Sequence, residues 1–386
     1  MARRHVAAGN GASDRGAVTA PPGEPGRALT LEAARGAVGR RLGIYSTELQ
    51  LLVGLAALYL FFALKYPETF GTSENLTNLT RQGAVLLVVA IGEMFALVVG
   101  GFDISVAANM GFTSTVAALV MTDHGVPAGI VAGLAAATGA GLVNGILIAV
   151  FRVCPFVATL AMLYFLRGLA NHISNGTSVG NLPEDFQWVG AKDWGPLPST
   201  FCIAVGFAIL AWILFTRTRV GLYVYAIGGS RDTTRLGGVP VVRYEVLAYT
   251  ACGFLAGVGG IMYGSRTSVG QASLGSGTEL QAIAAAVIGG VAIGGGVGRL
   301  WGVILGVAIL QVLQTGMDIA GLTEFIKDMV TAGVLVGAVL LTLLRGRGLR
   351  GLYRQVAQSR AVAELRGSEE RRRMQALKSL LRRGDL

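Results

Sequence analysis

The chain contains a series of long apolar stretches, most of about twenty residues, which follow one another between Leu49 and Leu344. A helix of roughly twenty residues crosses the hydrocarbon core of a bilayer, which is about 30 Å thick. A helix at the surface of a soluble core alternates apolar and polar faces, whereas these stretches are apolar on all sides. The pattern therefore predicts an all-α polytopic membrane protein.

The composition agrees with this fold class, since 53% of the residues are hydrophobic, 14% are charged and 57 of the 386 are glycines. Glycine is common where membrane helices pack closely, because close backbones gain van der Waals contact. Glycines four residues apart are therefore predicted to form packing seams, some of them at a dimer interface. These pairs are Gly141/Gly145, Gly253/Gly257, Gly290/Gly294, Gly302/Gly306 and Gly333/Gly337.

The stretches predict about ten transmembrane helices, at residues 48–64, 83–100, 104–122, 126–151, 155–174, 199–215, 244–265, 278–296, 299–316 and 325–344. An even number places both termini on one side of the membrane. Most of the arginines lie in the two end segments, so the positive-inside rule puts both termini in the cytoplasm. The connections then predicted inside carry Arg152, Arg217, Arg219, Arg231, Arg235, Arg243 and Arg299, whereas most loop acids fall outside.

The net charge of +10 is thus read as membrane topology, and no binding to nucleic acid is expected. Residues 1–44 are predicted to be a disordered basic tail without a secretory signal, and residues 45–345 the transmembrane domain. Residues 346–386 are predicted to form a basic cytoplasmic tail. Its apolar residues share one helical face amid arginines, which predicts an amphipathic helix on anionic lipid: Met374, Leu377, Leu380 and Leu381.

The residues that carry catalysis or metal binding in other proteins are sparse in this sequence. Cys154, Cys202 and Cys252 lie in or beside apolar stretches without metal-type spacing, so neither a disulfide framework nor a metal site is expected. None of the four lysines follows a glycine and precedes serine or threonine, so the chain has no P-loop. No catalytic residue is predicted, and any ATP that drives the protein has to bind to a separate subunit.

Two of the predicted spans, 83–100 and 104–122, are joined by a very short connection. Gly100 and Gly101 are adjacent there and Asp103 follows them, which suggests a broken helix whose free backbone groups line a cavity. Gly100, Gly101, Asp103 and Ser105 are the predicted structural junction. Asp103 is expected to cap the following helix or to pair with an arginine of the cytoplasmic side.

The longest predicted cytoplasmic connection covers residues 216–243. Within it residues 230–236 are predicted to form a short helix, with Ser230 as its cap, Asp232 in its first turn and glycines 237 and 238 as its stop. A short polar helix between two spans suits docking of a cytoplasmic protein, and a plain solvated connector is the alternative.

Two predicted outside loops also stand apart. Residues 175–199 are acidic and aromatic, which suits a lid or a docking surface for an external partner. Residues 266–277 are small and rich in glycine and serine, and they lead into the span that begins at 278. There Ser276 is expected to cap the helix while Glu279 reaches back to it.

Four ordered blocks of sequence occur between Leu49 and Leu344. They are GGFDISV at 100–106; GLVNG at 141–145 with PFVATL at 155–160 and RG at 167–168; YAIGG at 225–229 through RLGGV at 235–239; and ELQAIAA at 279–285 with GG at 289–290 and GGVG at 295–298. Together they resemble the permease subunits of bacterial ABC importers for monosaccharides of the ribose, xylose and galactose type. The chain departs from that pattern at Ala107, where the family has glycine, at Glu93, where it has an uncharged residue, and in its longer C-terminal tail.

The resemblance implies a subunit of the bacterial cytoplasmic (inner) membrane that forms a translocation path as a dimer with a second copy of itself. It also implies an extracytoplasmic sugar-binding protein and an ABC-type ATPase subunit, which holds ATP and magnesium, so that no cofactor is expected on this chain. The residues that match the ATPase-coupling segment are Ser230, Arg231, Asp232, Arg235, Leu236 and Gly238.

Polar side chains within the predicted spans are the candidates for the substrate path. A charged group at mid-bilayer costs about 2.5–3.5 kcal/mol on insertion scales, so it normally faces protein or water. Glu93 is expected to line the path or to pair with Arg167 or another buried partner, and Arg167 otherwise snorkels. Amides and hydroxyls suit sugar hydroxyls, although many only join helices. The full set is Glu93, Asn109, Asn144, Thr159, Arg167, Asn171, Glu279 and Gln281.

Two other functions remain open at this point. An ion-coupled secondary transporter for a small polar solute would use Glu93 as its coupling carboxylate, and a membrane scaffold would carry no solute at all. The solute itself does not follow from the residues.

Overall fold

The computed structural model describes residues 47–340. The predictions for the two tails, and for residues 341–344 of the last expected span, lie outside the described residues. Within them the chain is mostly helical, with one short hairpin of two antiparallel strands, β1 (Asp193–Trp194) and β2 (Leu197–Pro198). The all-α fold class is therefore confirmed.

The helices follow the expected stretches closely along most of the chain. They are α2 (Ser73–Val98), α3 (Val106–His124), α4 (Val126–Ala149), α5 (Pro155–Ile173), η1 (Glu184–Phe186), α6 (Gln187–Gly190), α7 (Ser199–Arg217), α8 (Arg219–Gly229), α9 (Arg231–Leu236), α10 (Val241–Thr267), α11 (Thr278–Ile288) and α12 (Leu300–Ile319). Helices also cover Thr47–Lys65 and residues 324–340.

Seven of the described helices are long and apolar enough to cross a membrane: Thr47–Lys65, α2, α4, α5, α7, α10 and α12. This number fits a multi-pass membrane protein. The expected continuous span at 278–296 is wrong, because α11 has 11 residues and reaches only about 16 Å. Gly290, Gly295 and Gly296 follow it with positive φ angles, and such a backbone ends a helix.

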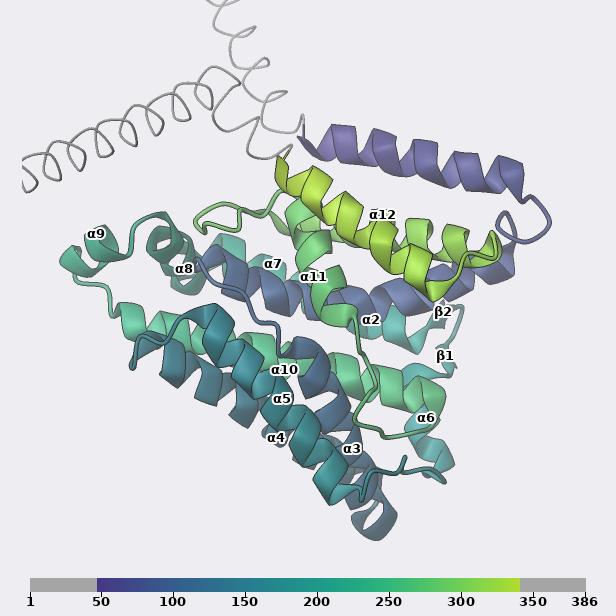
Figure 1. Ribbon diagram of the computed structural model, residues 1–386, viewed down its shortest axis with the longest axis horizontal. Coiled ribbons are helices and arrows are strands. Elements are labelled where there is room, and N and C mark those ends of the chain that lie inside the picture. Colours follow the sequence, from purple (N-terminus) through teal and green to yellow (C-terminus); the bar gives the residue numbers. More distant parts are fainter. Residues whose placement is uncertain (1–46, 341–386) are drawn as a thin grey trace, which may run out of the picture. The chain divides into compact units, whose positions relative to one another are not determined.

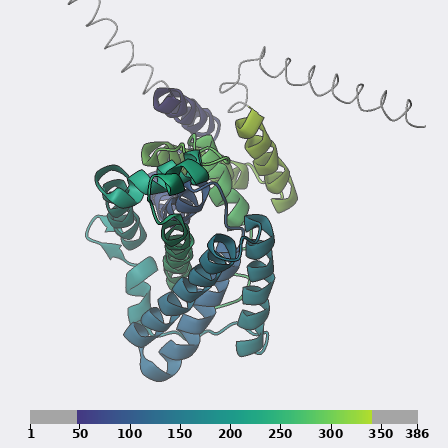
Figure 2. The same ribbon diagram turned by 90° about the vertical axis from the view of Figure 1, so that its left-hand side faces the viewer.

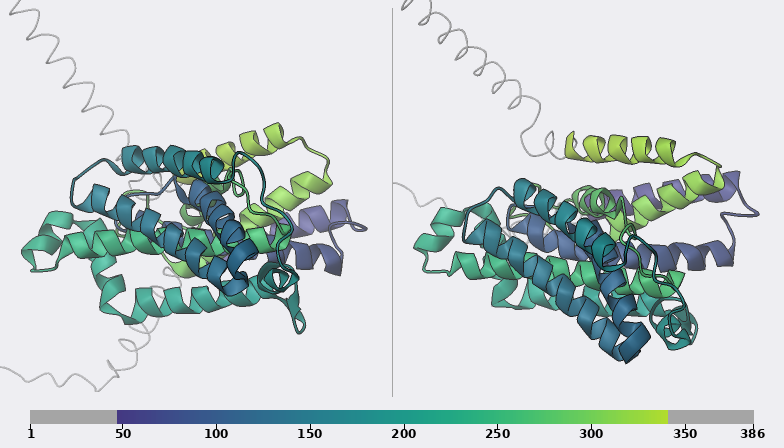
Figure 3. Two further views of the ribbon diagram at one scale, coloured as in Figure 1. Left: turned by 90° about the horizontal axis from the view of Figure 1, so that it is seen from below. Right: turned by 60° about the horizontal axis from the view of Figure 1, so that its bottom comes forward.

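Helices α2 and α10 form the centre of the bundle. In the apolar window of α2 78% of the residues are buried, compared with 6% for Thr47–Lys65. Helix α10 packs against α2, α3 and α4. Figures 1 and 2 show α3, α4 and α5 (blue to teal) on one side, with Thr47–Lys65 (purple) and helix 324–340 (yellow-green) on the opposite side. The right-hand view of Figure 3 shows the same arrangement, with α3 and α4 below Thr47–Lys65 and helix 324–340.

Several predicted glycine seams hold these helices together. A Cβ atom at Gly141 would lie 2.6 Å from the Tyr249 carbonyl oxygen, and one at Gly253 would lie 2.8 Å from the Ala137 carbonyl oxygen. Glycine thus lets the backbones of α4 and α10 touch. Helices α11 and α12 meet in the same way through Gly302 and Gly306, whose Cβ atoms would overlap carbonyl oxygens of α11 and its end.

The other two glycine pairs behave differently. Gly290 and Gly294 lie in the loop after α11, so the predicted helical seam is wrong there. A Cβ atom at Gly333 or Gly337 would meet no atom of the described residues within 4 Å. These two glycines therefore make no seam within the described part of the chain.

The loop between α5 and α7 is folded rather than extended. It contains η1, α6 and the hairpin, and its indole rings of Trp188 and Trp194 pack with centroids 4.4 Å apart. The Ser265 hydroxyl of α10 donates to the Phe186 carbonyl, and Arg81 of α2 pairs with Asp193 at 2.6 Å. The loop thus packs against the C-terminal end of α10 and against Arg81 of α2. In Figure 1 this is the end of the bundle opposite α8 and α9.

Candidate functional site

The connection from α2 to α3 is a buried turn that depends on glycine. Gly100 has a φ of 95°, and the Gly101 amide still donates to the Ala96 carbonyl at 3.0 Å. A Cβ atom at Gly101 would overlap the hydroxyl oxygen of Tyr249 on α10. A larger residue at position 101 would therefore separate this turn from α10.

Asp103 organises the turn that leads into α3. Its Oδ1 accepts hydrogen bonds from the Ser105 amide at 2.9 Å and from the Ser105 hydroxyl at 2.5 Å. The Nδ2 of Asn144 on α4 donates to Ser105 Oγ at 3.0 Å and lies 3.3 Å from Asp103 Oδ2. Asp103 therefore binds the start of α3 and α4, and it does not form the alternative pair with an arginine among the described residues.

Glu93 completes this cluster from the last third of α2. Its Oε1 accepts from the Asp103 amide at 3.0 Å, and the Cys252 thiol lies 3.8 Å from its Oε2. Its side chain is fully buried, and the expected pair with Arg167 is not formed. Burying a carboxylate without a cation costs several kcal/mol. We call Glu93, Asp103, Ser105, Asn144 and Cys252 the buried polar junction.

Helix α10 also contributes to these contacts, which was not predicted from the sequence. Glu245, Tyr249 and Cys252 are spaced four and three residues apart, so they share one face of the helix. That face reaches from the surface to the junction. The spacing of these three residues along one face of the mostly apolar α10 was the signal that could have identified them.

The remaining inner candidates for the substrate path, Asn109 and Thr159, form hydrogen bonds to backbone carbonyl groups. Asn109 of α3 donates from Nδ2 to the Gly253 carbonyl of α10 at 3.1 Å and to the Ala137 carbonyl of α4 at 3.3 Å. The Thr159 hydroxyl donates to Pro155 within α5. Their placement on a substrate path stays a prediction.

The outer candidates gather where α5 ends and α11 begins. Arg167 Nη2 donates to the Ser276 hydroxyl at 3.3 Å, and Asn171 donates to the Arg167 carbonyl at 2.9 Å. Arg167 Nε and Glu279 Oε2 are buried without a hydrogen-bond partner among the described residues. Gln281 follows in α11. The predicted Ser276 cap is wrong, because Gly277 precedes α11 and makes no side-chain capping bond.

The second cluster of candidates lies at the opposite end, in the segment that contains α8 and α9. Ser230 caps α9, accepting from the Thr233 amide at 3.4 Å, and Gly238 follows with a φ of 79°. The short helix predicted here is confirmed. None of its residues is buried, and Leu236 is 85% exposed. The whole of α9 therefore lies at the surface of the described residues, where a partner can reach it.

One ion pair fastens α9 to α10. Arg231 Nε and Nη2 contact the two oxygens of Glu245 at 2.5 and 2.7 Å, a bidentate geometry that is stronger than a single contact. The Glu245 carboxylate raises the pKa of the Arg231 guanidinium. The Arg231 side chain therefore attaches α9 to Glu245 of α10, whereas the side chains of Asp232 and Arg235 are exposed.

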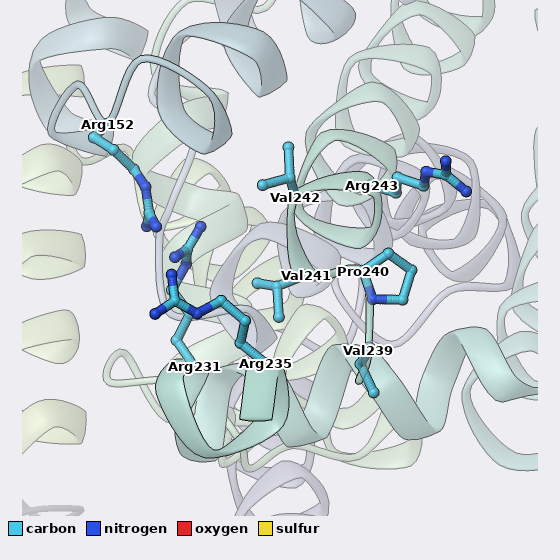
Figure 4. Close-up of a pocket in the computed structure, with 8 residues that line it drawn as sticks. All are labelled: Arg152, Arg231, Arg235, Val239, Pro240, Val241, Val242 and Arg243. Atoms are coloured by element: carbon cyan, nitrogen blue, oxygen red, sulfur yellow. The ribbon is translucent and has the colours of Figure 1, made fainter. Parts of the chain in front are cut away.

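A pocket of about 400 Å³ lies beside α9. It is lined by Arg152, Arg231, Arg235, Val239, Pro240, Val241, Val242 and Arg243, which we call the arginine pocket. Figure 4 shows the guanidinium groups of Arg152, Arg231 and Arg235 turned toward one another, while Arg243 points away.

The two clusters meet at glycines. The Gly296 amide donates to the Val98 carbonyl at 2.9 Å, so the loop after α11 joins the end of α2. A Cβ atom at Gly228 of α8 would overlap both of these backbone groups. The Tyr225 hydroxyl donates to the Gly298 carbonyl at 2.8 Å, and burial raises the pKa of Tyr225 to about 12.

Comparison with known proteins decides the family. Residues 75–343 match the model of the family described as "Branched-chain amino acid transport system / permease component". The chain belongs to this permease family. It is 34% identical over 299 residues to the ribose import permease protein RbsC of Escherichia coli (strain K12), a match that covers 76% of this chain and 93% of that protein.

Two other relatives agree with this assignment. The L-arabinose ABC transporter permease protein AraH of Azospirillum brasilense is 33% identical over 330 residues, which cover 85% of this chain and 96% of that protein. The D-allose transport system permease protein AlsC of Escherichia coli (strain K12) is 31% identical over 294 residues, which cover 75% and 90%. The predicted resemblance to sugar permeases is confirmed, and the chain is a permease component rather than an enzyme.

Proposed function

We propose that this permease is the membrane subunit of an ATP-driven, binding-protein-dependent monosaccharide importer, and that α9 is where its ATPase subunit docks. The observation that carries the docking assignment is the exposed α9, whose Leu236 faces away from the chain while Arg231 ties the helix to Glu245. A helix that is rigidly attached but uncovered can pass the movement of a partner into the bundle.

The route for that movement runs through α10 and α8. A displacement of α9 pulls on Glu245, and the same face of α10 carries Tyr249 and Cys252 to the buried polar junction. Gly228 of α8 transmits a second contact to the end of α2. ATP and magnesium bind to the ATPase subunit, and helices α8, α9 and α10 of this chain carry the movement into the bundle.

The sugar path is proposed to pass the outer candidates. Arg167 and Glu279 each keep a buried polar atom without a partner, and sugar hydroxyls both donate and accept hydrogen bonds. Asn171 lies four residues after Arg167 in α5, and Gln281 lies two residues after Glu279 in α11, so each of the two helices adds an amide group. The three relatives carry names of ribose, L-arabinose and D-allose, which supports a monosaccharide as the solute class.

The finer membrane topology is part of the same proposal. The seven apolar helices, α3 and helix 324–340 give nine crossings, and the short α11 with its following loop takes the place of the continuous span expected at 278–296 as the tenth. Both termini, α8 and α9 then lie in the cytoplasm, and the folded loop with η1 and α6 lies outside, where a sugar-binding protein docks. Two copies of the chain in the bacterial inner membrane form the path.

The test replaces the exposed leucine of α9. Leu236→Asp should abolish uptake of ribose, L-arabinose and D-allose in cells that also produce the cognate ATPase and binding protein, because it puts a charge at the docking surface. Leu236→Met is the matched control and should keep uptake. Since Leu236 is exposed, both variants should reach the membrane in equal amounts. Normal uptake by Leu236→Asp would contradict docking on α9.

A further inference from the structure

The arginine pocket gathers positive charge from separate parts of the chain. Arg152 comes from the connection between α4 and α5, while Arg231 and Arg235 come from α9. Figure 4 shows their three guanidinium groups converging. Of these, only Arg231 has a carboxylate partner among the described residues, and that partner is Glu245. Arg152 and Arg235 line the same pocket without such a partner, and their like charges repel one another unless an anion lies between them.

Guanidinium groups select the chemistry of that anion. Arginine offers planar, paired N–H donors that match phosphate and carboxylate oxygens, and it binds either in a bidentate manner. The pocket floor is apolar, because Val239, Pro240, Val241 and Val242 line it. An occupant that carries both an anionic group and apolar chain fits such a pocket better than a small hydrated ion does.

The position of the pocket narrows the choice further. Helix α4 ends at Ala149, and α5 and α10 begin at Pro155 and Val241, so the pocket lies where three apolar helices end. Beside it Val150 and Phe151 are 52% and 68% exposed. The ends of membrane-spanning helices are the level of lipid headgroups, and basic pockets between such helices bind anionic headgroups.

We propose that the arginine pocket binds the phosphate of an anionic phospholipid. The phosphate lies between Arg152 and Arg235, and its acyl chains follow the exposed apolar surface at Val150 and Phe151. The bound lipid joins the α4–α5 connection to α9 and so holds the docking helix at a fixed height relative to the membrane. This binding site is independent of which solute the permease carries.

The experiment measures lipid retention by the full chain. The permease is released from nanodiscs of phosphatidylcholine that contain phosphatidylglycerol, and retained lipid is counted by native mass spectrometry. A basic residue near the membrane surface contributes about 1 kcal/mol to anionic-lipid binding, which is about a fivefold change in affinity. Arg152→Gln should therefore lose about fivefold in phosphatidylglycerol affinity, and Arg152→Gln with Arg235→Gln about 25-fold.

Control variants and competing ligands decide the outcome. Arg152→Lys keeps the charge and should retain most of the binding, and Arg219→Gln removes an exposed arginine outside the pocket and should retain all of it. Equal retention of phosphatidylglycerol by all variants overturns the proposal. Retention of phosphatidylcholine equal to that of phosphatidylglycerol also overturns it. Full displacement of the lipid by millimolar inorganic phosphate overturns it as well, because the pocket would then be a site for small anions. Loss of ATPase binding with unchanged lipid binding would assign the pocket to the partner protein instead.

Discussion

The buried polar junction and the α8–α9 segment use the same local chemistry for opposite purposes. Each interrupts long helices, and each combines a side-chain oxygen that binds a nearby amide with glycines at positive φ. In the junction Glu93, Asp103, Ser105 and Asn144 are all buried, whereas α9 has no buried residue. The surroundings therefore decide whether a polar turn stabilises the interior or presents a surface.

The difference teaches where substitutions should be felt. Groups in the junction have exchanged water for protein partners, so loss of one partner leaves another buried and unsatisfied. Most groups on α9 remain in water, so their loss costs little stability and acts mainly on the partner. Arg231 differs, because it is largely covered and paired with Glu245. The contact at Gly228 of α8 belongs to both regions.

Breaking the contact between the regions should have the largest effect. Gly228→Ala should destabilise the permease by about 3 kcal/mol, because its Cβ atom overlaps the Val98 and Gly296 backbones. Gly229→Ala is the matched control, since a Cβ atom there meets nothing within 4 Å. Thermal unfolding in detergent should show a lower midpoint for Gly228→Ala alone. Equal midpoints would mean that α8 is free of the bundle.

Within the junction, Asp103→Ala should cost about 2–3 kcal/mol, because it leaves the Ser105 amide and the Ser105 hydroxyl without their acceptor. Asp103→Asn keeps one acceptor oxygen and should recover about half of the loss. The same thermal measurement checks both variants. If both unfold with the wild type, the turn does not depend on this side chain.

On the α9 side, Arg231→Gln should cost about 1–2 kcal/mol, since the pair with Glu245 is partly buried and so lies between a surface and a fully buried ion pair. The double variant with Glu245→Gln should be more stable than Arg231→Gln alone, because it removes the unpaired carboxylate. A double-mutant cycle of unfolding midpoints measures the coupling. A zero coupling energy would show that the pair does not hold α9.

The cap of α9 should matter less. Ser230→Ala should cost about 0.5–1 kcal/mol of local helix stability, and Ser230→Asp should preserve it. Hydrogen exchange of the α9 amides is the suitable measurement, because global unfolding averages over the whole bundle. Unchanged exchange in Ser230→Ala would remove the cap from the account of this segment.

The smallest effect is expected at Glu93, and it tests the rival function. Glu93→Gln keeps the oxygen that accepts from the Asp103 amide and should change stability by less than about 1 kcal/mol. ATP-driven uptake should persist. An ion-coupled carrier would instead lose uptake with Glu93→Gln, and an uncoupler would stop its wild-type uptake while ATP is held constant.

The sequence predicted those features that depend on local pattern. Apolar length marked nearly every long helix, and Ser230 with the glycines at 237 and 238 marked α9 and its limits. The pairs Gly141/Gly145 and Gly253/Gly257 marked the seam of α4 and α10, because a missing side chain is useful only where backbones touch. The four blocks of similarity marked the family.

Partners across the fold could not be read in this way. The sequence left Glu93 with a choice of partners, and the structure gives it the Asp103 amide and Cys252, since α10 returns beside α2. It placed a continuous span at 278–296, but the chain there leaves the helix to bring Gly296 against Val98. An apolar run has the same composition whether it continues as a helix or turns back.

By itself the sequence determined that this permease lies in a membrane, where most of its helices lie and which family it belongs to. Hydropathy and local turn chemistry act over a few residues at a time, so they can be read from the sequence. Only the tertiary structure decided that Arg231 holds Glu245 while Arg152 and Arg235 converge on one pocket. The sequence of a basic loop is equally compatible with an arginine that pairs with a carboxylate and with arginines that line a common pocket. The choice between them follows from which helix ends the packing of α4, α5 and α10 brings together.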